Sequence, residues 1–274
     1  MNTPLAGVIG WPINHSKSPN IHKYWLKKHG ILGDYHTLSI KPEDFIKELK
    51  SLPSMGYVGA NVTIPHKEAA LANAREVTTR ARAIGAANTL VFLPCGGYRA
   101  DNTDGEGFIN NIKQNASDWD ASAGRALVIG AGGAARAILY SLLAEGAPEI
   151  LLANRTKSRA ETLASEFGNR ITVIDWADIS SATIETKIIV NTTSLGMSGY
   201  DELKIDLRCS SQTLVTDIVY VPLQTNLLKE AANKGCVTVS GLGMLLHQAV
   251  PGFEAWFGIR PIVDESLIRK ILKR

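Results

Sequence analysis

Residues 126–136 read ALVIGAGGAAR, an apolar run followed by a glycine-rich turn. The turn matches the pattern G-x-G-x-x-A, with Gly130, Gly132 and Ala135 in its three defining positions. The first glycine permits a tight turn, the second lets a pyrophosphate approach the backbone, and the small third residue keeps helix and strand close. A helical stretch follows at residues 134–144. This combination predicts a dinucleotide site in a doubly wound α/β domain.

The sequence beyond the turn continues to alternate between strands and helices. Strands are predicted at residues 149–153, 171–174, 188–191, 214–218 and 237–240, and helices at 158–167 and 225–234. A helix N-terminus offers free N–H groups and a partial positive charge to phosphates. The residues expected to hold the nucleotide phosphates are Gly130, Ala131, Gly132, Gly133 and Ala134.

The segment after the second predicted strand of this domain indicates which nucleotide binds. Residues 154–159 read NRTKSR, and no acidic residue appears before Glu161. NAD sites usually carry an acid here for the ribose hydroxyls, whereas the planar guanidinium of Arg155 can grip a 2′-phosphate. Thr156 and Arg159 add a hydroxyl and a second cation. Cations oppose the dipole at a helix start unless an anion compensates them, so we expect NADP(H), with a solvated basic helix start as the alternative.

The N-terminal part has its own alternating pattern. Strands are predicted at residues 5–9, 35–40, 58–64 and 89–92, helices at 19–29, 42–52 and 67–74, and a hairpin turn at 93–99. This order favours a parallel α/β sheet. Residues from 243 onward have apolar side chains at helical spacing, so we expect them to pack back on this part. The predicted organisation is a substrate domain of residues 1–105 plus 243–274, a Rossmann-like NADP domain of residues 106–242, a linker at 114–124 and a cleft between the domains.

Two polar segments of the first domain carry groups suited to proton transfer. Residues 61–67 read NVTIPHK and end in Lys67, and residues 101–104 read DNTD and end in Asp104. An ammonium beside a carboxylate can move a proton during reaction, although Lys67 alone could be a surface lysine and Asp104 alone a helix cap. Ser16 and Ser18 precede a helix start and could bind a carboxylate or a polyol. Capping would explain Ser18, before Pro19, but not Ser16.

Composition excludes several classes of protein. The chain has 274 residues, of which 45% are hydrophobic and 20% charged, as in ordinary soluble proteins. No stretch approaches the ~20 apolar residues of a membrane span, the N-terminus does not read as a signal peptide, and a net charge of +3 does not favour nucleic acid. Three cysteines, Cys95, Cys209 and Cys236, lie far apart in sequence and predict neither a metal site nor a disulfide framework. A cytoplasmic protein is expected.

The chain resembles the shikimate dehydrogenases over nearly its whole length. The resemblance is carried by the serine pair at 16 and 18, the segments 61–67, 88–89 and 102–104, the glycine turn, residues 154–156 and Gln248, which occur in the order seen in that family. The resemblance implies NADP-linked interconversion of 3-dehydroshikimate and shikimate in chorismate and aromatic amino-acid biosynthesis. It implies that Lys67 and Asp104 are the catalytic pair and that Ser16 and Ser18 bind the substrate carboxylate. The residues implied for the ring hydroxyls are Asn61, Thr63, Lys67, Asn88, Asp104 and Gln248. Implied positions near the nucleotide are Asn154, Thr192, Ile218, Gly241 and Met244, with Tyr220 shared between nicotinamide and substrate.

The sequence leaves two other functions open. A quinate or dual quinate/shikimate dehydrogenase would need room for one more hydroxyl beside the two serines. A non-catalytic NADP-binding sensor would have no reason to keep both Lys67 and Asp104. The expected partners are a small-molecule substrate and, at most, a second copy of the chain, since the pattern is compatible with a monomer or a homodimer.

Overall fold

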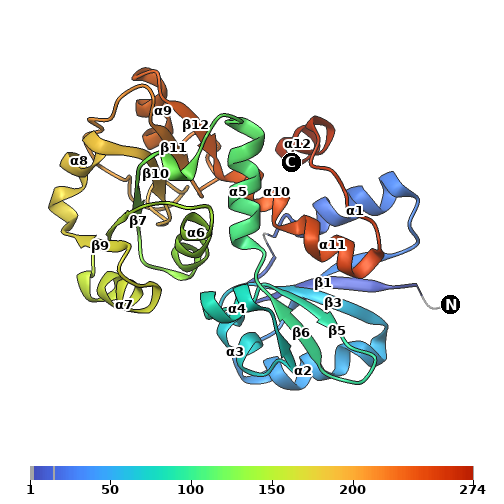
Figure 1. Ribbon diagram of the computed structural model, residues 1–274. Helices are drawn as coiled ribbons and strands as arrows, with labels where there is room; N and C mark the ends of the chain where they lie inside the picture. Colours follow the sequence, from blue (N-terminus) through green and yellow to red (C-terminus); the bar gives the residue numbers. More distant parts are fainter. Residues whose placement is uncertain (1–2, 15, 274) are drawn as a thin grey trace. The chain divides into compact units, whose positions relative to one another are not determined.

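The computed structural model describes residues 3–14 and 16–273, and the chain divides into two compact α/β units (Figure 1). One unit comprises Met1–Thr103 and Leu246–Arg274, and the other Asp104–Leu245. The linker expected at residues 114–124 is wrong. Helix α5 (Asp104–Asn115) reaches into that segment, and its Phe108 and Ile112 are buried in the core of the second unit. The polar residues that suggested a linker form a surface turn within this unit.

The sheet of the first unit has the strand order β2-β1-β3-β5-β6-β4. Its strands are β1 (Leu5–Gly10), β2 (Asp34–Ser39), β3 (Tyr57–Val62), β4 (Glu76–Val77), β5 (Thr89–Phe92) and β6 (Tyr98–Asp101). Strands β2, β1 and β3 are parallel, but β5 is antiparallel to both β3 and β6. The expected all-parallel sheet is therefore wrong at β5, because the short turn that follows it can join only antiparallel neighbours. The hairpin itself was expected.

Helices cover both faces of this sheet (Figure 1). They are α1 (Ser18–His29), α2 (Phe45–Ser51), α3 (Lys67–Ala72), α4 (Thr79–Ile84), α11 (Ala249–Phe257) and α12 (Glu265–Leu272). Alternate residues of β3 face opposite ways: Ala60 and Val62 pack with α2 and α3, while Gly59 faces α11. A Cβ on Gly59 would lie 2.1 Å from Nε1 of Trp256, which donates to the Leu90 oxygen at 2.8 Å. The C-terminal segment thus docks on this sheet.

An aromatic cluster fills the interface between α1, β2 and α11. His22 is fully buried and stacks on Tyr35, with ring centroids 4.0 Å apart and planes 4° from parallel. Trp25 meets His22 edge-on, and Phe253 stacks near it. Burial lowers the pKa of His22 from 6.5 to about 3, so the ring is neutral at physiological pH.

This buried histidine predicts a pH-dependent stability. Between pH 6.5 and about 3 the unfolded chain protonates His22 and the native chain does not. The contribution of His22 to the free energy of unfolding is therefore fully present above pH 6.5 and falls by about 1.4 kcal/mol for each pH unit below it. In urea unfolding, the stability of wild type relative to His22→Gln should fall by roughly 2 kcal/mol from pH 7 to pH 5. A difference that stays constant with pH would contradict this reading.

The second unit has the doubly wound topology that its glycine turn predicts. Six parallel strands lie in the order β12-β11-β10-β7-β8-β9. They are β7 (Arg125–Ile129), β8 (Ile150–Ala153), β9 (Ile171–Ile174), β10 (Thr186–Asn191), β11 (Leu214–Asp217) and β12 (Val237–Ser240). The strand order reverses between β7 and β10, and ligands of such sheets bind at the carboxyl ends of strands at this reversal.

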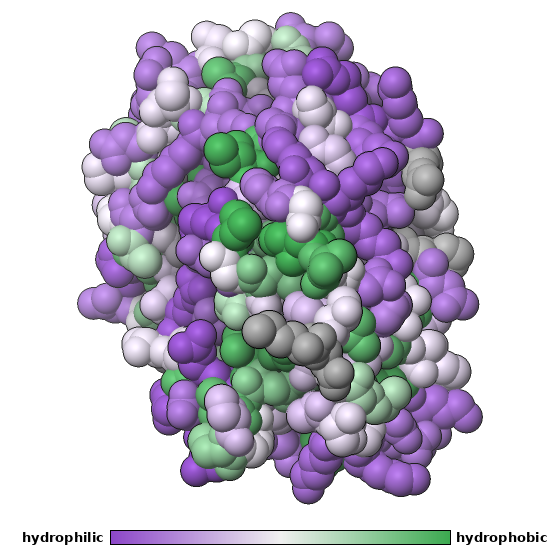
Figure 2. Space-filling model, turned by 90° about the vertical axis from the view of Figure 1, so that its right-hand side faces the viewer, coloured by the Kyte–Doolittle hydropathy of each residue, from purple (hydrophilic) through white to green (hydrophobic). Residues whose placement is uncertain are grey.

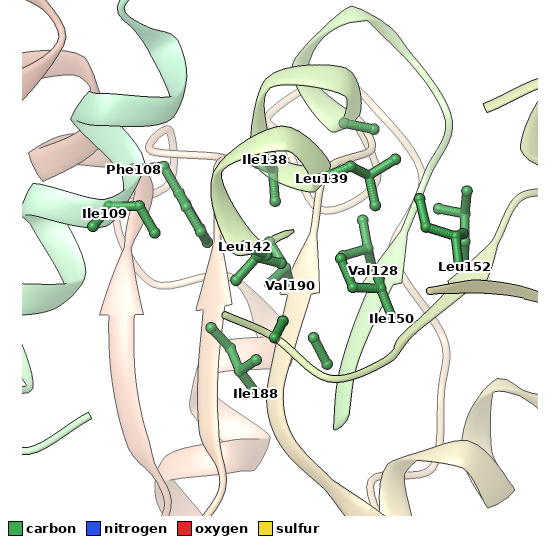
Figure 3. Close-up of a cluster of buried hydrophobic side chains, with 14 of the residues drawn as sticks. Phe108, Ile109, Val128, Ile138, Leu139, Leu142, Ile150, Leu152, Ile188 and Val190 are labelled. Atoms are coloured by element: carbon green, nitrogen blue, oxygen red, sulfur yellow. The ribbon is translucent and has the colours of Figure 1, made fainter. Parts of the chain in front are cut away.

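Helices α5, α6 (Gly133–Ala144) and α7 (Lys157–Phe167) cover one face of this sheet, and α8 (Ile179–Ala182) and α9 (Asn226–Asn233) belong to the other. Figure 3 shows Phe108, Ile138 and Leu142 of the first group against Val128 and Ile188 of the strands. Helix α10 (Gly241–His247) follows β12 and contains the last division between the units.

The face that Figure 2 shows is covered mainly by hydrophilic residues, with smaller hydrophobic patches. Within residues 3–14 and 16–273, no helix is long and apolar enough to cross a membrane, and no group of three or more His, Cys, Asp or Glu side chains could hold a metal ion. The sulfur atoms of Cys209 and Cys236, distant in sequence, lie 3.6 Å apart, although both are free thiols.

Candidate active site

A buried polar cluster lies at the ends of strands β3, β5 and β6. Asn61, near the end of β3, donates from Nδ2 to the Asn88 oxygen at 3.1 Å and to Oγ1 of Thr89 at 3.2 Å. Asn88 directly precedes β5, and its Oδ1 accepts from the N–H of Thr103 at 2.9 Å. Asn61 and Asn88 are 5% and 3% exposed, so these amides are held by internal hydrogen bonds rather than by water. The antiparallel strand β5 is what brings the three segments together.

Gln248 joins this cluster from the far end of the sequence. The Oγ1 of Thr103 donates to the Gln248 backbone oxygen at 2.8 Å, and Nδ2 of Asn88 lies 3.4 Å from Oε1 of Gln248. The structure therefore brings together Asn61, Asn88 and Gln248, three of the residues proposed to bind substrate. Thr89 and Thr103, which organise them, were not identified from sequence. Thr103 lies in the DNTD segment at 101–104, and Thr89 in the Asn-Thr pair at 88–89. In both segments only other residues were predicted to bind substrate.

Lys67 is the first residue of α3 and is partly buried. Its backbone oxygen accepts from the N–H of Ala87 at 3.0 Å, which ties the helix start to the segment leading to Asn88. The preceding His66 is buried, stacks on Phe45 with centroids 4.4 Å apart, and contacts the Ile40 oxygen through Nε2 at 2.8 Å. His66 thus anchors the loop. Thr63, in the same loop, is partly exposed, and its N–H donates to the Ile9 oxygen at 2.9 Å.

Helix capping was the alternative to a ligand role for the two serines. Ser18 is the first residue of α1, but the N-cap is Lys17, and no side-chain capping bond is made there. Instead, Oγ of Ser16 accepts from the N–H of Ser18 at 3.2 Å. Capping therefore does not account for Ser18. An oxygen that accepts at the helix start keeps its own proton to donate, so both hydroxyls remain suitable for a carboxylate.

Asp104 is the first residue of α5, where its charge complements the helix dipole. Just before it, Asp101 accepts from Nε of Arg80 and from Oγ1 of Thr78, each at 2.7 Å. Burial disfavours the charge of Asp101, but these bonds outweigh burial and hold its pKa below the usual value. The Asp101 network was not identified from sequence. Lys67 belongs to the first unit and Asp104 to the second, and their catalytic pairing stays a prediction.

The glycine turn after β7 has the local geometry of a phosphate site. Gly130 has φ of +111°, and a Cβ there would lie 2.5 Å from Oγ1 of Thr192 at the end of β10. A Cβ on Gly132 or Gly133 would meet nothing within 4 Å, so their backbone faces open space at the start of α6. A pyrophosphate can therefore approach these N–H groups without a side chain in the way.

Asn154 links the turn to the end of the neighbouring strand. Its Oδ1 accepts from the N–H of Ala131 at 3.1 Å, and its Nδ2 donates to the Thr156 oxygen at 2.8 Å. Thr156 is the N-cap of α7, and Ala134 lies in the first turn of α6. Asn154 therefore acts as a brace between the phosphate turn and the basic segment that follows β8.

The basic segment presents two arginines without internal counter-charges. Arg155 and Arg159 are exposed, and neither side chain has an ion-pair or hydrogen-bond partner within residues 3–14 and 16–273. Lys157 between them pairs with Asp175 at 2.7 Å. The first turn of α7 has no acidic residue. Two cations at a helix N-terminus are unfavourable unless an anion joins them, so the pair fits a bound phosphate.

The residues expected near the nicotinamide lie at the carboxyl ends of β10, β11 and β12. Oγ1 of Thr192 donates to the Ile129 oxygen at 2.8 Å. A Cβ on Gly241 would lie 2.1 Å from the Ile218 oxygen, so only glycine lets α10 start there. Ile218 and Tyr220 are partly buried, and Met244 packs against the core of this unit. These residues line the strand ends where a doubly wound sheet binds its ligand.

Asp217, which the sequence did not single out, organises this edge. Its carboxylate accepts from Nδ2 of Asn191 at 3.0 Å and from Oγ1 of Thr225 at 2.8 Å. Burial raises its pKa despite these bonds. The Asp217 carboxylate therefore joins the end of β10 to the start of α9.

Comparisons with known proteins identify the same family in successive parts of the chain. Family models match in sequence order: the shikimate dehydrogenase substrate binding domain at residues 8–90, shikimate / quinate 5-dehydrogenase at 111–218, and the shikimate 5'-dehydrogenase C-terminal domain at 241–265. A shikimate dehydrogenase (NADP(+)) of Paracoccus denitrificans is 55% identical over 272 residues, which cover 99% of this chain and 96% of the relative. The chain belongs to the shikimate dehydrogenase family.

Solved structures of shikimate dehydrogenase relatives share the two-domain architecture. The enzyme of Thermus thermophilus in complex with NADP(H) and shikimate is 33% identical, has a TM-score of 0.86, and is similar over 100% of this chain and 99% of the other. A quinate dehydrogenase of Corynebacterium glutamicum in complex with NAD is 28% identical, with a TM-score of 0.91 over 99% of each chain. The fold predicted from the sequence, an N-terminal α/β domain and a Rossmann-like domain, is confirmed.

Proposed function

We propose that this chain is an NADP-dependent shikimate dehydrogenase that reduces 3-dehydroshikimate to shikimate, reversibly, in aromatic amino-acid biosynthesis. The full-length identity with NADP(+)-dependent relatives carries the proposal. The buried amide cluster supports it, because preset amides that converge at strand ends suit a substrate with several ring hydroxyls. The glycine turn and the two arginines without counter-charges support NADP as the nucleotide.

The chain's own residues supply binding, orientation and proton transfer. The backbone at residues 131–133 would hold the pyrophosphate, and Arg155, Thr156 and Arg159 the 2′-phosphate. When bound, the reduced nicotinamide supplies a hydride to the substrate ketone. The ammonium of Lys67 stabilises the negative charge that develops on the ketone oxygen and donates a proton to it. Asp104 orients the reacting hydroxyl.

The proposal also assigns the residues that bind the substrate. Ser16 and Ser18 donate to the carboxylate from the start of α1. The side chains assigned to ring hydroxyls are Asn61, Thr63, Asn88 and Gln248, joined by Lys67 and Asp104. Tyr220, on the Rossmann-like unit, is assigned a contact to the substrate beside the nicotinamide.

Quinate is the second candidate substrate, favoured by the similarity to the quinate dehydrogenase structure. Quinate carries one more hydroxyl near the carboxylate, so the space beside Ser16 and Ser18 decides between the acids. The test is kcat/KM for shikimate and quinate with NADP and NAD. We expect the highest value for shikimate with NADP. A higher value for quinate would overturn the substrate assignment, and an inert chain that still binds NADP would be a sensor.

We further propose a cytoplasmic protein that acts as a monomer or a homodimer on a small-molecule substrate. The two neighbouring free thiols, Cys209 and Cys236, are suited to a reducing compartment. Sedimentation of the purified chain at several concentrations checks the oligomeric state.

The serine pair gives a prediction that separates substrate from nucleotide binding. Ser16→Ala and Ser18→Ala should each raise KM for shikimate on the order of tenfold, because each removes a hydrogen bond to a charged group. The KM for NADP should stay unchanged. Ser54→Ala is a matched control, since Ser54 is exposed and its hydroxyl donates to the Ser51 oxygen. Changes confined to the KM for NADP would show that the serines are not at the substrate carboxylate.

A further inference from the structure

Tyr35 makes a hydrogen bond to one of the residues assigned to substrate. It is the second residue of β2 and is fully buried. Its hydroxyl donates to Oδ1 of Asn61 at 2.7 Å. Asn61 is assigned to a ring hydroxyl, so a buried phenol contacts a side chain of the substrate site.

The direction of this hydrogen bond follows from the protons available. A phenol has one proton, and Tyr35 gives it to Asn61. Burial raises the pKa of Tyr35 well above its usual value, so this proton stays in place.

The same count fixes the orientation of the Asn61 amide. Its Nδ2 donates to the Asn88 oxygen and to Oγ1 of Thr89, and its Oδ1 accepts from Tyr35. Reversing the amide would set its NH2 group against the Tyr35 proton and its oxygen against the Asn88 oxygen. Without the Tyr35 hydroxyl, one of these constraints is gone and a buried amide oxygen loses its donor.

The ring of Tyr35 is held independently of its hydroxyl. It stacks on the neutral His22 and lies near Trp256, with centroids 6.1 Å apart. A phenylalanine at this position would keep these contacts. The hydroxyl can therefore be removed on its own, which separates positioning of Asn61 from packing of the core.

We propose that Tyr35 is a positioning residue for substrate binding, whose hydroxyl sets the Asn61 amide in the orientation that receives a ring hydroxyl of the acid. The inference rests on the proposed function, because it assumes that Asn61 binds substrate. Tyr35 does not touch the reacting atoms. Its effect falls on KM for the acid, not on kcat or on KM for the nucleotide.

The test compares wild type, Tyr35→Phe and Tyr57→Phe in steady-state oxidation of shikimate by NADP, with Tm measured for each. Tyr57 is the matched control, because its hydroxyl contacts Nδ1 of His36 at 3.0 Å rather than Asn61. Tyr35→Phe should raise KM for shikimate on the order of tenfold, with kcat and KM for NADP within about twofold of wild type. An unchanged KM in a folded Tyr35→Phe, or an equal rise in Tyr57→Phe, would overturn the proposal.

A double-mutant cycle with Asn61→Ala gives a second measure. If Tyr35 acts through Asn61, the effects on KM should combine to less than their product. Fully multiplicative effects would overturn the proposal. If Tyr35→Phe does not fold, 4-aminophenylalanine at position 35 replaces it. This residue still donates to Asn61, so KM should stay within a few-fold of wild type, and a KM as high as that of Asn61→Ala would overturn the Asn61 role.

Wild-type turnover is measured first, because it separates a failure of the proposed function from a failure of the Tyr35 role. A wild type that does not oxidise shikimate with NADP would overturn the proposed function, and the Tyr35 role with it. Wild-type turnover together with an unchanged KM in Tyr35→Phe would overturn the Tyr35 role alone.

Discussion

Replacing Lys67 with alanine is expected to lower kcat on the order of 10²-fold or more, with a smaller change in KM for shikimate. The ammonium is needed mainly as charge develops on the ketone oxygen, so its loss acts on the transition state more than on the bound substrate. Lys67 stands at the start of α3, and its backbone is tied to Ala87. That bond is made by the backbone, so the alanine variant keeps it.

The matched control is Lys47→Ala, which removes an exposed lysine from α2 in the same unit. It should leave kcat and KM unchanged. Both variants are assayed by nucleotide absorbance at saturating substrate, and circular dichroism checks that each is folded. A folded Lys67→Ala with near-normal kcat would show that another group transfers the proton. Asp104→Asn should also slow turnover, with a larger share of its effect on KM.

Replacing Arg155 with alanine should raise KM for NADP on the order of 10- to 10²-fold and leave NAD use nearly unchanged. A charge-assisted bond to phosphate contributes ~1.5–3 kcal/mol, and every 1.4 kcal/mol is about tenfold in affinity. Arg155 and Arg159 have no side-chain partner in the described chain. Their loss therefore breaks no internal ion pair, and the effect should appear only with the phosphorylated nucleotide.

Lys157→Ala is the control for position and charge. Lys157 lies between the two arginines but pairs with Asp175, so its removal should leave the ratio of kcat/KM for NADP and NAD within a few-fold of wild type. If Arg155→Ala and Lys157→Ala have equally small effects on this ratio, the basic segment is only a solvated helix start. In that case the choice of NADP would need another structural basis.

The second unit was largely predictable because its signals are local. The glycine turn, the strand before it and the helix after it lie within about twenty residues, and the parallel topology follows from regular alternation. The first unit was harder, because the direction of β5 depends on a hairpin rather than on a crossover. The polarity of residues 114–124 was likewise ambiguous, since a surface turn and an interdomain linker have the same composition.

The site residues show a similar limit. Lys67, Asn61 and Gln248 could be named from motif order, but the contacts that hold them are long-range. Thr103 reaches Gln248 across 145 residues, and Tyr35 reaches Asn61 across 26. Periodicity and spacing carry no information about such pairs, because a buried threonine or tyrosine reads as an ordinary strand residue. The sequence also did not show that the hydroxyl of Ser16, rather than that of Ser18, accepts a backbone hydrogen bond at the start of α1. Two serines one residue apart give equally good local signals.

The proposed activity of this chain is hydride transfer between NADPH and 3-dehydroshikimate. The most direct measurement uses NADPH deuterated at the transferred position of the nicotinamide, with mass spectrometry of the product acid. We predict that shikimate forms with one deuterium for each nucleotide oxidised, and that Lys67→Ala forms the same product far more slowly. Nucleotide oxidation without labelled shikimate, or no oxidation at all by the folded wild type, would contradict the account.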